Sequence, residues 1–307
     1  MVPWALLLGG LEAACRPQDD AWPGRRRTLE LAGERLPEPY ESLKILHRPL
    51  GRPRPGEWLA VHPEPGQSFA EYKESDPVRP GRRLRTIYIQ PLGEFTGDQE
   101  KILQKATEYM GLYFSVPVEV RPRLSAANVP PEARRENLGA TQILTSWVLK
   151  NLLLPRRPED ALAWLAFTSD DLWPGPGWNF VFGEASLRDR VGVWSIFRNG
   201  DPSRSEADFR LCLRRTIQTA THETGHILGM LHCVAHPCAM NGSNHRMESD
   251  ARPLALCPPC LAKLCWNVGA DPAARYEGLA RFCEREGLRE EAAFFSKALR
   301  ILREVPK

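Results

Sequence analysis

The sequence has no long apolar run and no excess of charge of either sign. No stretch approaches the ~18 apolar residues that a transmembrane helix needs, so we expect no membrane span. The 41 basic and 38 acidic residues leave a net charge of +3, which is too balanced to indicate a nucleic-acid partner. The 307 residues are 42% hydrophobic and 26% charged, a composition ordinary for a globular protein of one large domain or two small ones.

The N-terminus lacks a clear targeting signal. The apolar run at residues 4–8 is short, and no lysine or arginine precedes it. A secretory signal normally has a basic start and a longer apolar region, so we expect a cytoplasmic protein. The alternative is an exported protein in which residues 1–15 act as a signal peptide. Residues 1–55 are rich in proline and arginine, and we interpret them as a flexible leader.

The eight cysteines are not spread along the chain as a disulfide framework would be. Five of them lie between positions 233 and 265. Close cysteine pairs next to histidines are typical of metal binding in a reducing compartment. Cys15 is the only thiol before Cys212, so a pro-segment that blocks a metal through a cysteine is not expected.

Hydrophobic periodicity predicts alternating strands and helices. Strands are expected at 85–90, 116–120, 163–168, 179–182 and 191–197, and helices at 98–113, 137–153, 211–229, 273–286 and 290–302. This order indicates a mixed α/β sheet layer. Pro91 is expected to stop the first strand, and the last two helices are interpreted as a brace against the rest of the chain.

One segment carries a metal-binding motif. It reads His222-Glu223-Thr224-Gly225-His226-Ile227-Leu228-Gly229-Met230-Leu231-His232. Residues four apart lie on one face of a helix, so His222 and His226 can bind the same ion, and zinc accepts imidazole nitrogens. Glu223 is next to the first ligand, where a carboxylate can act as the general base on a zinc-activated water.

Gly229 explains how a third histidine can reach the ion. Glycine adopts positive φ at little cost and ends helices, so the chain can turn back and bring His232 to the same metal. Three histidines with an open fourth position describe a catalytic zinc site, and the pattern is the metzincin signature. The alternative is three histidines that only satisfy local hydrogen bonds.

A second cluster follows the third histidine directly. Cys233 and Cys238 form one close pair, and Cys257 and Cys260 form another. This is the spacing of a four-cysteine structural zinc site, which would hold the preceding loop in place. Disulfides, or cysteines that act as small core residues, are the competing interpretations. Cys265 is the nearby thiol that could be mistaken for a ligand.

Together these motifs resemble the archaemetzincin family of zinc metallopeptidases, within the metzincin clan. The resemblance rests on HExxHxxG, a third histidine, C-x4-C-x-M and a CxxC pair, all present between residues 222 and 260. Flanking matches extend it over roughly residues 56–270. They are Glu57–Leu59, His62–Pro65, Trp178–Gly183, Gly242–His245 and Arg252–Leu254.

The resemblance implies an α+β fold: a metzincin-like zinc peptidase domain with a mixed, twisted β-sheet over the active-site helix, and a C-terminal subdomain stabilised by the four-cysteine zinc site. It implies Met240 as the Met-turn residue beneath the catalytic metal. Because Gly242 stands where some metzincins carry a tyrosine, no tyrosine ligand is expected. Two zinc ions per chain are implied, a catalytic one on His222, His226 and His232 and a structural one on Cys233, Cys238, Cys257 and Cys260.

The chain is therefore expected to divide into a leader (1–55), an archaemetzincin-like catalytic domain (56–270) and a C-terminal helical hairpin (271–307). We expect a monomer that hydrolyses peptides or proteins, with the substrate extended along an edge strand near 191–197 or Asn179. One alternative is a catalytically inactive, zinc-stabilised peptide-binding or interaction module. Another is a zinc-ribbon-like nucleic-acid adaptor, which the acidic residues interleaved with basic ones near the cysteines disfavour.

Overall fold

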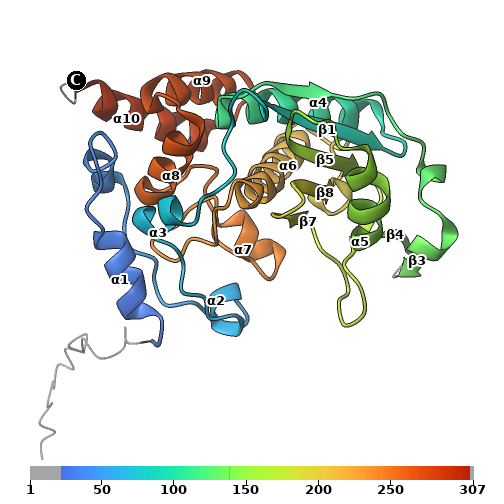
Figure 1. Ribbon diagram of the computed structural model, residues 1–307, viewed down its shortest axis with the longest axis horizontal. Coiled ribbons are helices and arrows are strands. Elements are labelled where there is room, and N and C mark those ends of the chain that lie inside the picture. The colour runs from blue at the N-terminus through green and yellow to red at the C-terminus, as the bar shows by residue number, and fades with distance from the viewer. Residues whose placement is uncertain (1–21, 138, 305–307) are drawn as a thin grey trace, which may run out of the picture.

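The centre of the molecule is a five-stranded sheet in the order β2-β1-β5-β8-β7, with helices against its faces (Figure 1). The computed structural model describes residues 22–137 and 139–304. Four strands of the sheet are parallel, and the edge strand β7 is antiparallel to β8. The strands are β1 (Thr86–Leu92), β2 (Val118–Val120), β5 (Ala161–Thr168), β7 (Gly183–Ser186) and β8 (Val191–Ser195).

The central strand β5 shows why both faces of the sheet are covered. All eight of its residues are buried. Leu165 and Phe167 belong to one hydrophobic cluster, whereas Trp164 and Ala166 belong to another. Successive side chains of a strand point to opposite faces, so a strand that is apolar at every position must lie between two layers. The predicted mixed α/β sheet layer is confirmed.

The helices that follow the strands supply these two layers. One layer contains α4 (Gly97–Phe114) and α6 (Glu206–Ile227), which pack against each other. The other contains α5 (Thr145–Trp147) and its irregular continuation to Arg156. The remaining helices are α1 (Arg25–Gly33), α2 (Trp58–Val61), α3 (Phe69–Glu74), α7 (Arg246–Asp250), α8 (Pro258–Val268), α9 (Pro272–Arg285) and α10 (Arg289–Glu304).

Helix α6 carries the metal-binding motif on its last two turns. It begins after Ser205, whose side chain accepts a hydrogen bond from the backbone N–H of Asp208. This bond caps one of the N–H groups of the first turn that have no partner within the helix. One side of α6 is buried against the sheet and α4, including Ile217 and Ala220. The helix is thus fixed along its length, and its C-terminal end is presented at the surface beside β7.

Most of the predicted elements are present, with two differences near the middle of the chain. The helix expected at 137–153 is wrong in its first half. Residues Arg134–Asn137 and Ala140–Leu144 form an antiparallel hairpin, β3 and β4, which joins β6 (Asp171–Trp173) in a second sheet. The first strand, β1, does not stop at Pro91 but continues to Leu92. The pairing of β1 with β2 ends at Ile89, so the N–H that Pro91 lacks is not needed for a hydrogen bond between these two strands.

Two further expectations are corrected at the ends of elements. The strand expected at 179–182 contains only an isolated bridge between Val181 and Leu172, and the true strand β7 begins at Gly183. The described part of the expected flexible leader is packed: Leu31 and Leu43 are buried in the main core, and residues 25–33 form α1. The predicted domain boundaries stay predictions.

Residues 1–15, and with them Cys15 and the alternative of a signal peptide, lie outside the described residues. Within the part that the structure describes, none of the helices combines the length and the apolar character that crossing a membrane requires. The expectations of a cytoplasmic location and of a monomer stay predictions.

Candidate metal centres

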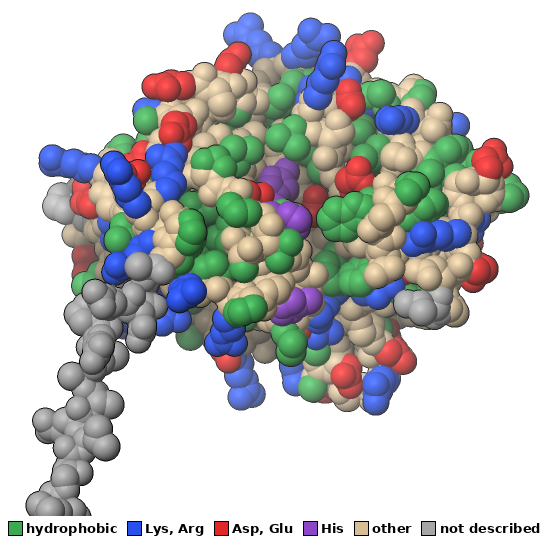
Figure 2. Space-filling model, turned by 90° about the horizontal axis from the view of Figure 1, so that it is seen from below, with side chains coloured by type: hydrophobic (Ala, Val, Ile, Leu, Met, Phe, Trp, Pro, Cys, Tyr) green, Lys and Arg blue, Asp and Glu red, His purple; other side chains and the backbone are tan. Residues whose placement is uncertain are grey.

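The three predicted histidine ligands converge at one point. Each of His222, His226 and His232 offers a ring nitrogen within 4.8 Å of those of the other two. The Nε2 atoms of His222 and His226 are 3.0 Å apart. Zinc–nitrogen bonds of about 2.0–2.1 Å in a tetrahedron place two donors roughly 3.3 Å apart, so the spacing fits one zinc ion. Figure 2 shows histidine side chains near the middle of one face of the molecule, in a hollow.

The second ring nitrogen of each histidine is already engaged. The Nδ1 atom of His222 is 2.9 Å from the carbonyl oxygen of Ala239, and that of His226 is 2.7 Å from the carbonyl oxygen of Met230. A carbonyl only accepts, so both Nδ1 atoms carry the hydrogen and both Nε2 atoms present a lone pair. This is the arrangement that fixes the tautomer and the ring orientation of zinc-binding histidines.

Burial also keeps the first two histidines neutral. Burial lowers the pKa of His222 well below its ordinary value and lowers the pKa of His226 to about 4. The neighbouring imidazoles lower both values further. Neutral imidazole is the form that binds a metal. Two of the three histidines, His222 and His226, are therefore unprotonated donors near pH 7 without further rearrangement.

The turn after α6 forms as predicted. Gly229 has a φ of +85°, and its N–H bonds the carbonyl of His226 at 2.8 Å. A side chain at this position would also meet Pro77, because an added Cβ would lie 2.8 Å from the Cβ of that proline. Glycine is required here for both conformation and space. The turn brings His232 back to the end of the helix.

Glu223 lies in the same cleft as the histidines. The cleft is a cavity of about 500 Å³ between α6 and the segment from Gly177 to Ala185. Burial, followed by the nearby carboxylate of Glu184, raises the pKa of Glu223 to about 8. Glu184 itself accepts a hydrogen bond from the hydroxyl of Thr145. The cleft thus contains a carboxyl group whose pKa lies close to neutral pH.

Met240 lies beneath the histidines, as the resemblance implies. It is buried, and a Cβ added to Gly225 would lie 2.6 Å from its Sδ atom. Gly225 is therefore the position at which the helix allows the methionine to approach. The neighbouring Ala239 supplies the carbonyl that holds His222. The segment around Met240 forms an apolar floor and also orients a ligand.

The space beside Gly242 is filled by an aromatic ring from a distant segment. A Cβ at Gly242 would lie 2.4–2.6 Å from three atoms of the Trp58 indole. The same ring packs edge-on against His232, with the ring centroids 5.0 Å apart. Trp58 therefore occupies the room next to the metal ligands that a side chain at position 242 would need.

Glu64 is a site residue that the motif analysis misses. Both of its carboxylate oxygens accept from Nδ1 of His232, at 2.9 and 3.0 Å. Burial alone would raise its pKa, but the hydrogen bond and charge of His232, aided by Trp58, outweigh this and lower it overall. The sequence gives a weak signal only, since His62–Pro65 is one of the short segments that match the family pattern.

The second cluster also forms as expected. The sulfur atoms of Cys233, Cys238, Cys257 and Cys260 all lie within 4.8 Å of one another, and all four residues are buried. The Sγ atoms of Cys233 and Cys257 are 3.5 Å apart, close to the roughly 3.8 Å edge of a tetrahedral zinc–thiolate site. Every described cysteine is free, so the disulfide interpretation does not hold for these residues. Cys265 is not among the four.

Local structure favours the thiolate form of one of these cysteines, Cys233. Hydrogen bonds from the other thiols, that of Cys238 first, lower the pKa of Cys233 well below its ordinary value. Cys257 is the N-cap of α8, where the helix dipole stabilises negative charge, but burial, followed by the neighbouring thiols, raises the pKa of Cys257 and of Cys238 well above the ordinary value. Binding of a cation would favour their thiolate forms. The loop between the pairs is fixed by Asn241, whose side chain bonds the backbone of Cys233, His236 and Cys238 at 2.7–2.9 Å. The donor set fits a closed structural zinc site.

The expected substrate edge needs a correction. The strand at 191–197, seen as β8 (Val191–Ser195), lies between β5 and β7 and is not an edge. The free edge next to the cleft belongs to β7. The other expected position, Asn179, is tied down by its carbonyl oxygen, which accepts from Arg135 and Gln142 at 3.0 and 2.9 Å.

The chain is similar to known zinc peptidases along most of its length. The family model of peptidase family M54 matches residues 161–265. Archaemetzincin-2 of Homo sapiens is 35% identical over 297 residues, covering 83% of this chain and 80% of that protein. The archaemetzincin of Pyrococcus abyssi is 31% identical over 187 residues, covering 59% of this chain and 95% of that protein.

A solved structure gives the same result for the fold. The crystal structure of archaemetzincin from Methanopyrus kandleri is 28% identical, covers 62% of this chain and 99% of that chain, and has a TM-score of 0.50. The resemblance drawn from the zinc motif and the mixed sheet over α6 is therefore confirmed. The chain belongs to the archaemetzincin family and is a zinc metallopeptidase, a hydrolase whose substrates are peptides or proteins.

Proposed function

We propose that this chain hydrolyses peptide bonds at a zinc ion held by His222, His226 and His232, with Glu223 as the general base. A second zinc, held by the four cysteines, has a structural role. One observation carries the proposal: three Nε2 lone pairs point to one place beside a buried carboxyl group in an open cleft. That combination is what hydrolysis of an amide requires.

The residues around the ion have separate roles. Zinc, when bound, supplies Lewis-acid chemistry by acidifying water and polarising the scissile carbonyl. Glu223 accepts the proton of the attacking water and then delivers it to the leaving nitrogen. Burial raises the pKa of Glu223 to about 8, which lets the carboxyl group hold the proton between the two steps near neutral pH. A cation bound at the histidines would lower this pKa and favour the ionised form that accepts the proton first.

The free edge of β7 is the proposed place for the substrate. An extended peptide can add to this edge through backbone hydrogen bonds and then pass over the end of α6. Gly183 begins the strand, and an added Cβ there would lie 3.0 Å from Cγ of Glu223. Because glycine has no side chain, a peptide bound along β7 can lie close to the carboxyl group of Glu223.

Zinc stoichiometry and peptide cleavage test the proposal. We expect two zinc ions in the wild type and one in His226→Ala. We expect Glu223→Gln to retain both ions and to lose at least about 100-fold in kcat. Glu206→Gln is the matched control, because this glutamate lies on the same helix with its side chain 94% exposed.

Each result has a distinct meaning. One zinc ion that survives His226→Ala would show that the histidines hold no metal, and the proposal would be wrong. Two zinc ions without cleavage of any peptide in a diverse library would favour the alternative of an inactive, zinc-stabilised peptide-binding module. Full activity in Glu223→Gln would remove that residue from the mechanism while leaving the metal assignment intact.

A further inference from the structure

The N-terminal part of the chain wraps around the turn that carries the third histidine. The hydroxyl of Tyr72 donates to the carbonyl of Leu228 at 2.7 Å. The side chain of Gln67 bonds the carbonyl of Gly229 and the N–H of Leu231, each at 3.3 Å. Gln67 and Tyr72 therefore hold the backbone between Leu228 and Leu231 at three points, on the N-terminal side of His232.

Glu64 makes the one contact from this segment that reaches a proposed ligand directly. Its two oxygens accept from Nδ1 of His232 at 2.9 and 3.0 Å. Ionised carboxylates only accept, so this contact requires the hydrogen on Nδ1 and directs the lone pair of Nε2 into the cleft. His222 and His226 are held differently, by backbone carbonyls within seventeen residues of each along the chain.

The backbone on either side of Glu64 is fixed by hydrogen bonds to distant segments. The N–H of Trp58 donates to both oxygens of Glu248, at 3.1 and 3.0 Å, and Glu248 is buried. The carbonyl of Pro65 accepts from the guanidinium of Arg27 at 2.9 Å. These contacts fix the backbone that carries Glu64 at two points, one on each side of the carboxylate.

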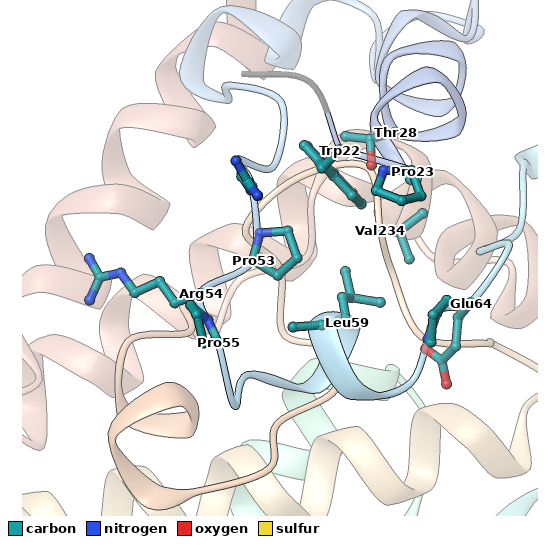
Figure 3. Close-up of a pocket in the computed structure, with 13 residues that line it drawn as sticks. Trp22, Pro23, Thr28, Pro53, Arg54, Pro55, Leu59, Glu64 and Val234 are labelled. Carbon is teal, nitrogen blue, oxygen red and sulfur yellow. The ribbon is translucent and has the colours of Figure 1, made fainter. Parts of the chain in front are cut away.

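Space around the Glu64 side chain is open on one side. It lines a cavity of about 600 Å³ whose walls include Leu59 and Val234 (Figure 3). The side chain of Glu64 is 28% exposed and that of His232 is 17% exposed. A glutamine of the same shape can therefore replace Glu64 without a steric clash, which makes the contact accessible to a conservative substitution.

We propose that Glu64 is a positioning residue for the third zinc ligand, supplied by a segment remote from the zinc motif. By accepting the Nδ1 hydrogen it holds His232 in one tautomer and one orientation, and it raises the basicity of the nitrogen that faces the ion. The inference rests on the proposed zinc site at the three histidines. It adds a carboxylate that the zinc motif does not contain.

Zinc affinity is the measurement that tests this role. The zinc dissociation constant of the histidine site is measured by chelator competition in wild type, Glu64→Gln, Glu64→Leu and Glu57→Gln. His226→Ala identifies the zinc that remains on the cysteines. We expect Glu64→Gln, whose amide oxygen still accepts the Nδ1 hydrogen but carries no charge, and Glu64→Leu, which offers no acceptor, to weaken the histidine site without changing the cysteine site. The larger loss, about 10–100-fold, is expected in Glu64→Leu. Glu57→Gln is the matched control, because its carboxylate bonds only the N–H of Arg54, at 2.7 Å.

The outcomes separate this inference from the proposed function. If wild type binds zinc at the histidines and folded Glu64→Gln and Glu64→Leu both bind it equally well, the positioning role is refuted while the zinc site stands. If wild type binds no zinc there, the proposed function fails first. Should Glu64→Gln not fold, Glu64→Asp keeps the charge but shortens the reach by one methylene, and unchanged zinc affinity in that variant refutes the inference.

Discussion

Replacing Gly242 with alanine tests how Trp58 is packed beside the metal ligands. Gly242 has no positive φ, so its backbone accepts alanine without strain, and the three atoms nearest to the new methyl group all belong to the indole of Trp58. The added Cβ would lie 2.4–2.6 Å from three ring atoms, roughly 1 Å inside ordinary van der Waals contact. The indole is rigid and its backbone is tied to Glu248, so it cannot move aside freely.

The expected magnitude follows from two opposing effects. Overpacking of this kind costs about 1–3 kcal/mol. Replacing glycine by alanine at a compatible position stabilises the folded protein by about 0.4–1 kcal/mol, because it lowers the conformational entropy of the unfolded chain. We therefore expect Gly242→Ala to lower the free energy of unfolding by about 1–2 kcal/mol. In a Trp58→Ala background the same change should raise it by about 0.5 kcal/mol, because the opposing ring is gone.

Urea unfolding of the four proteins, at one fixed zinc concentration, measures this double-mutant cycle. The reversal of sign is the decisive result, since it does not depend on the absolute cost of removing the tryptophan. If Gly242→Ala destabilises equally in both backgrounds, the glycine is required for some reason other than Trp58, and the packing argument is wrong.

Two further predictions concern stability elsewhere in the fold. Arg198→Ala should cost about 3–5 kcal/mol in thermal or urea unfolding, because it leaves the buried carboxylate of Asp171 without its bidentate partner at 2.7–2.8 Å; a loss below 1 kcal/mol would contradict this. Burial, with a smaller effect of His236, lowers the pKa of His47 to about 4, so the folded state resists its protonation. Stability should be complete above about pH 6.5 and decline as the pH falls towards 4, by up to about 3 kcal/mol from this group. His47→Gln should show a shallower decline when unfolding is measured from pH 7.5 to 4.5, and parallel curves would refute the assignment.

The parts of the proposed site that depend on local chain geometry could be predicted from the sequence. The spacing of His222 and His226 sets their common helix face, and Gly229 sets the turn that follows. The two cysteine pairs are close in sequence, so one loop and the start of the next helix are enough to bring the four thiols together. Each of these features is determined within about forty residues, where motif spacing carries the information.

The rest depended on contacts between distant segments or on weak local signals. Glu64 is 168 residues from its partner, and no pattern in the sequence pairs them. In the hairpin of β3 and β4, the residues Ala140, Ile143 and Leu144 have helical spacing, which outweighed the turn signal at Gly139, whose φ is +76°. Strand β7 (Gly183–Ser186) contains no β-branched residue, so its position as the sheet edge could not be predicted.

The wrapping of residues 64–72 around the turn before His232 also has a consequence for how the protein is made. Ribosomes add roughly 5–20 residues per second, so Glu64 leaves the ribosome roughly ten to thirty seconds before the histidine that it contacts, 168 residues later. During that interval the early segment has no turn to hold. The three-histidine site therefore cannot be completed until the chain has been synthesised beyond Ala239, whose carbonyl orients His222.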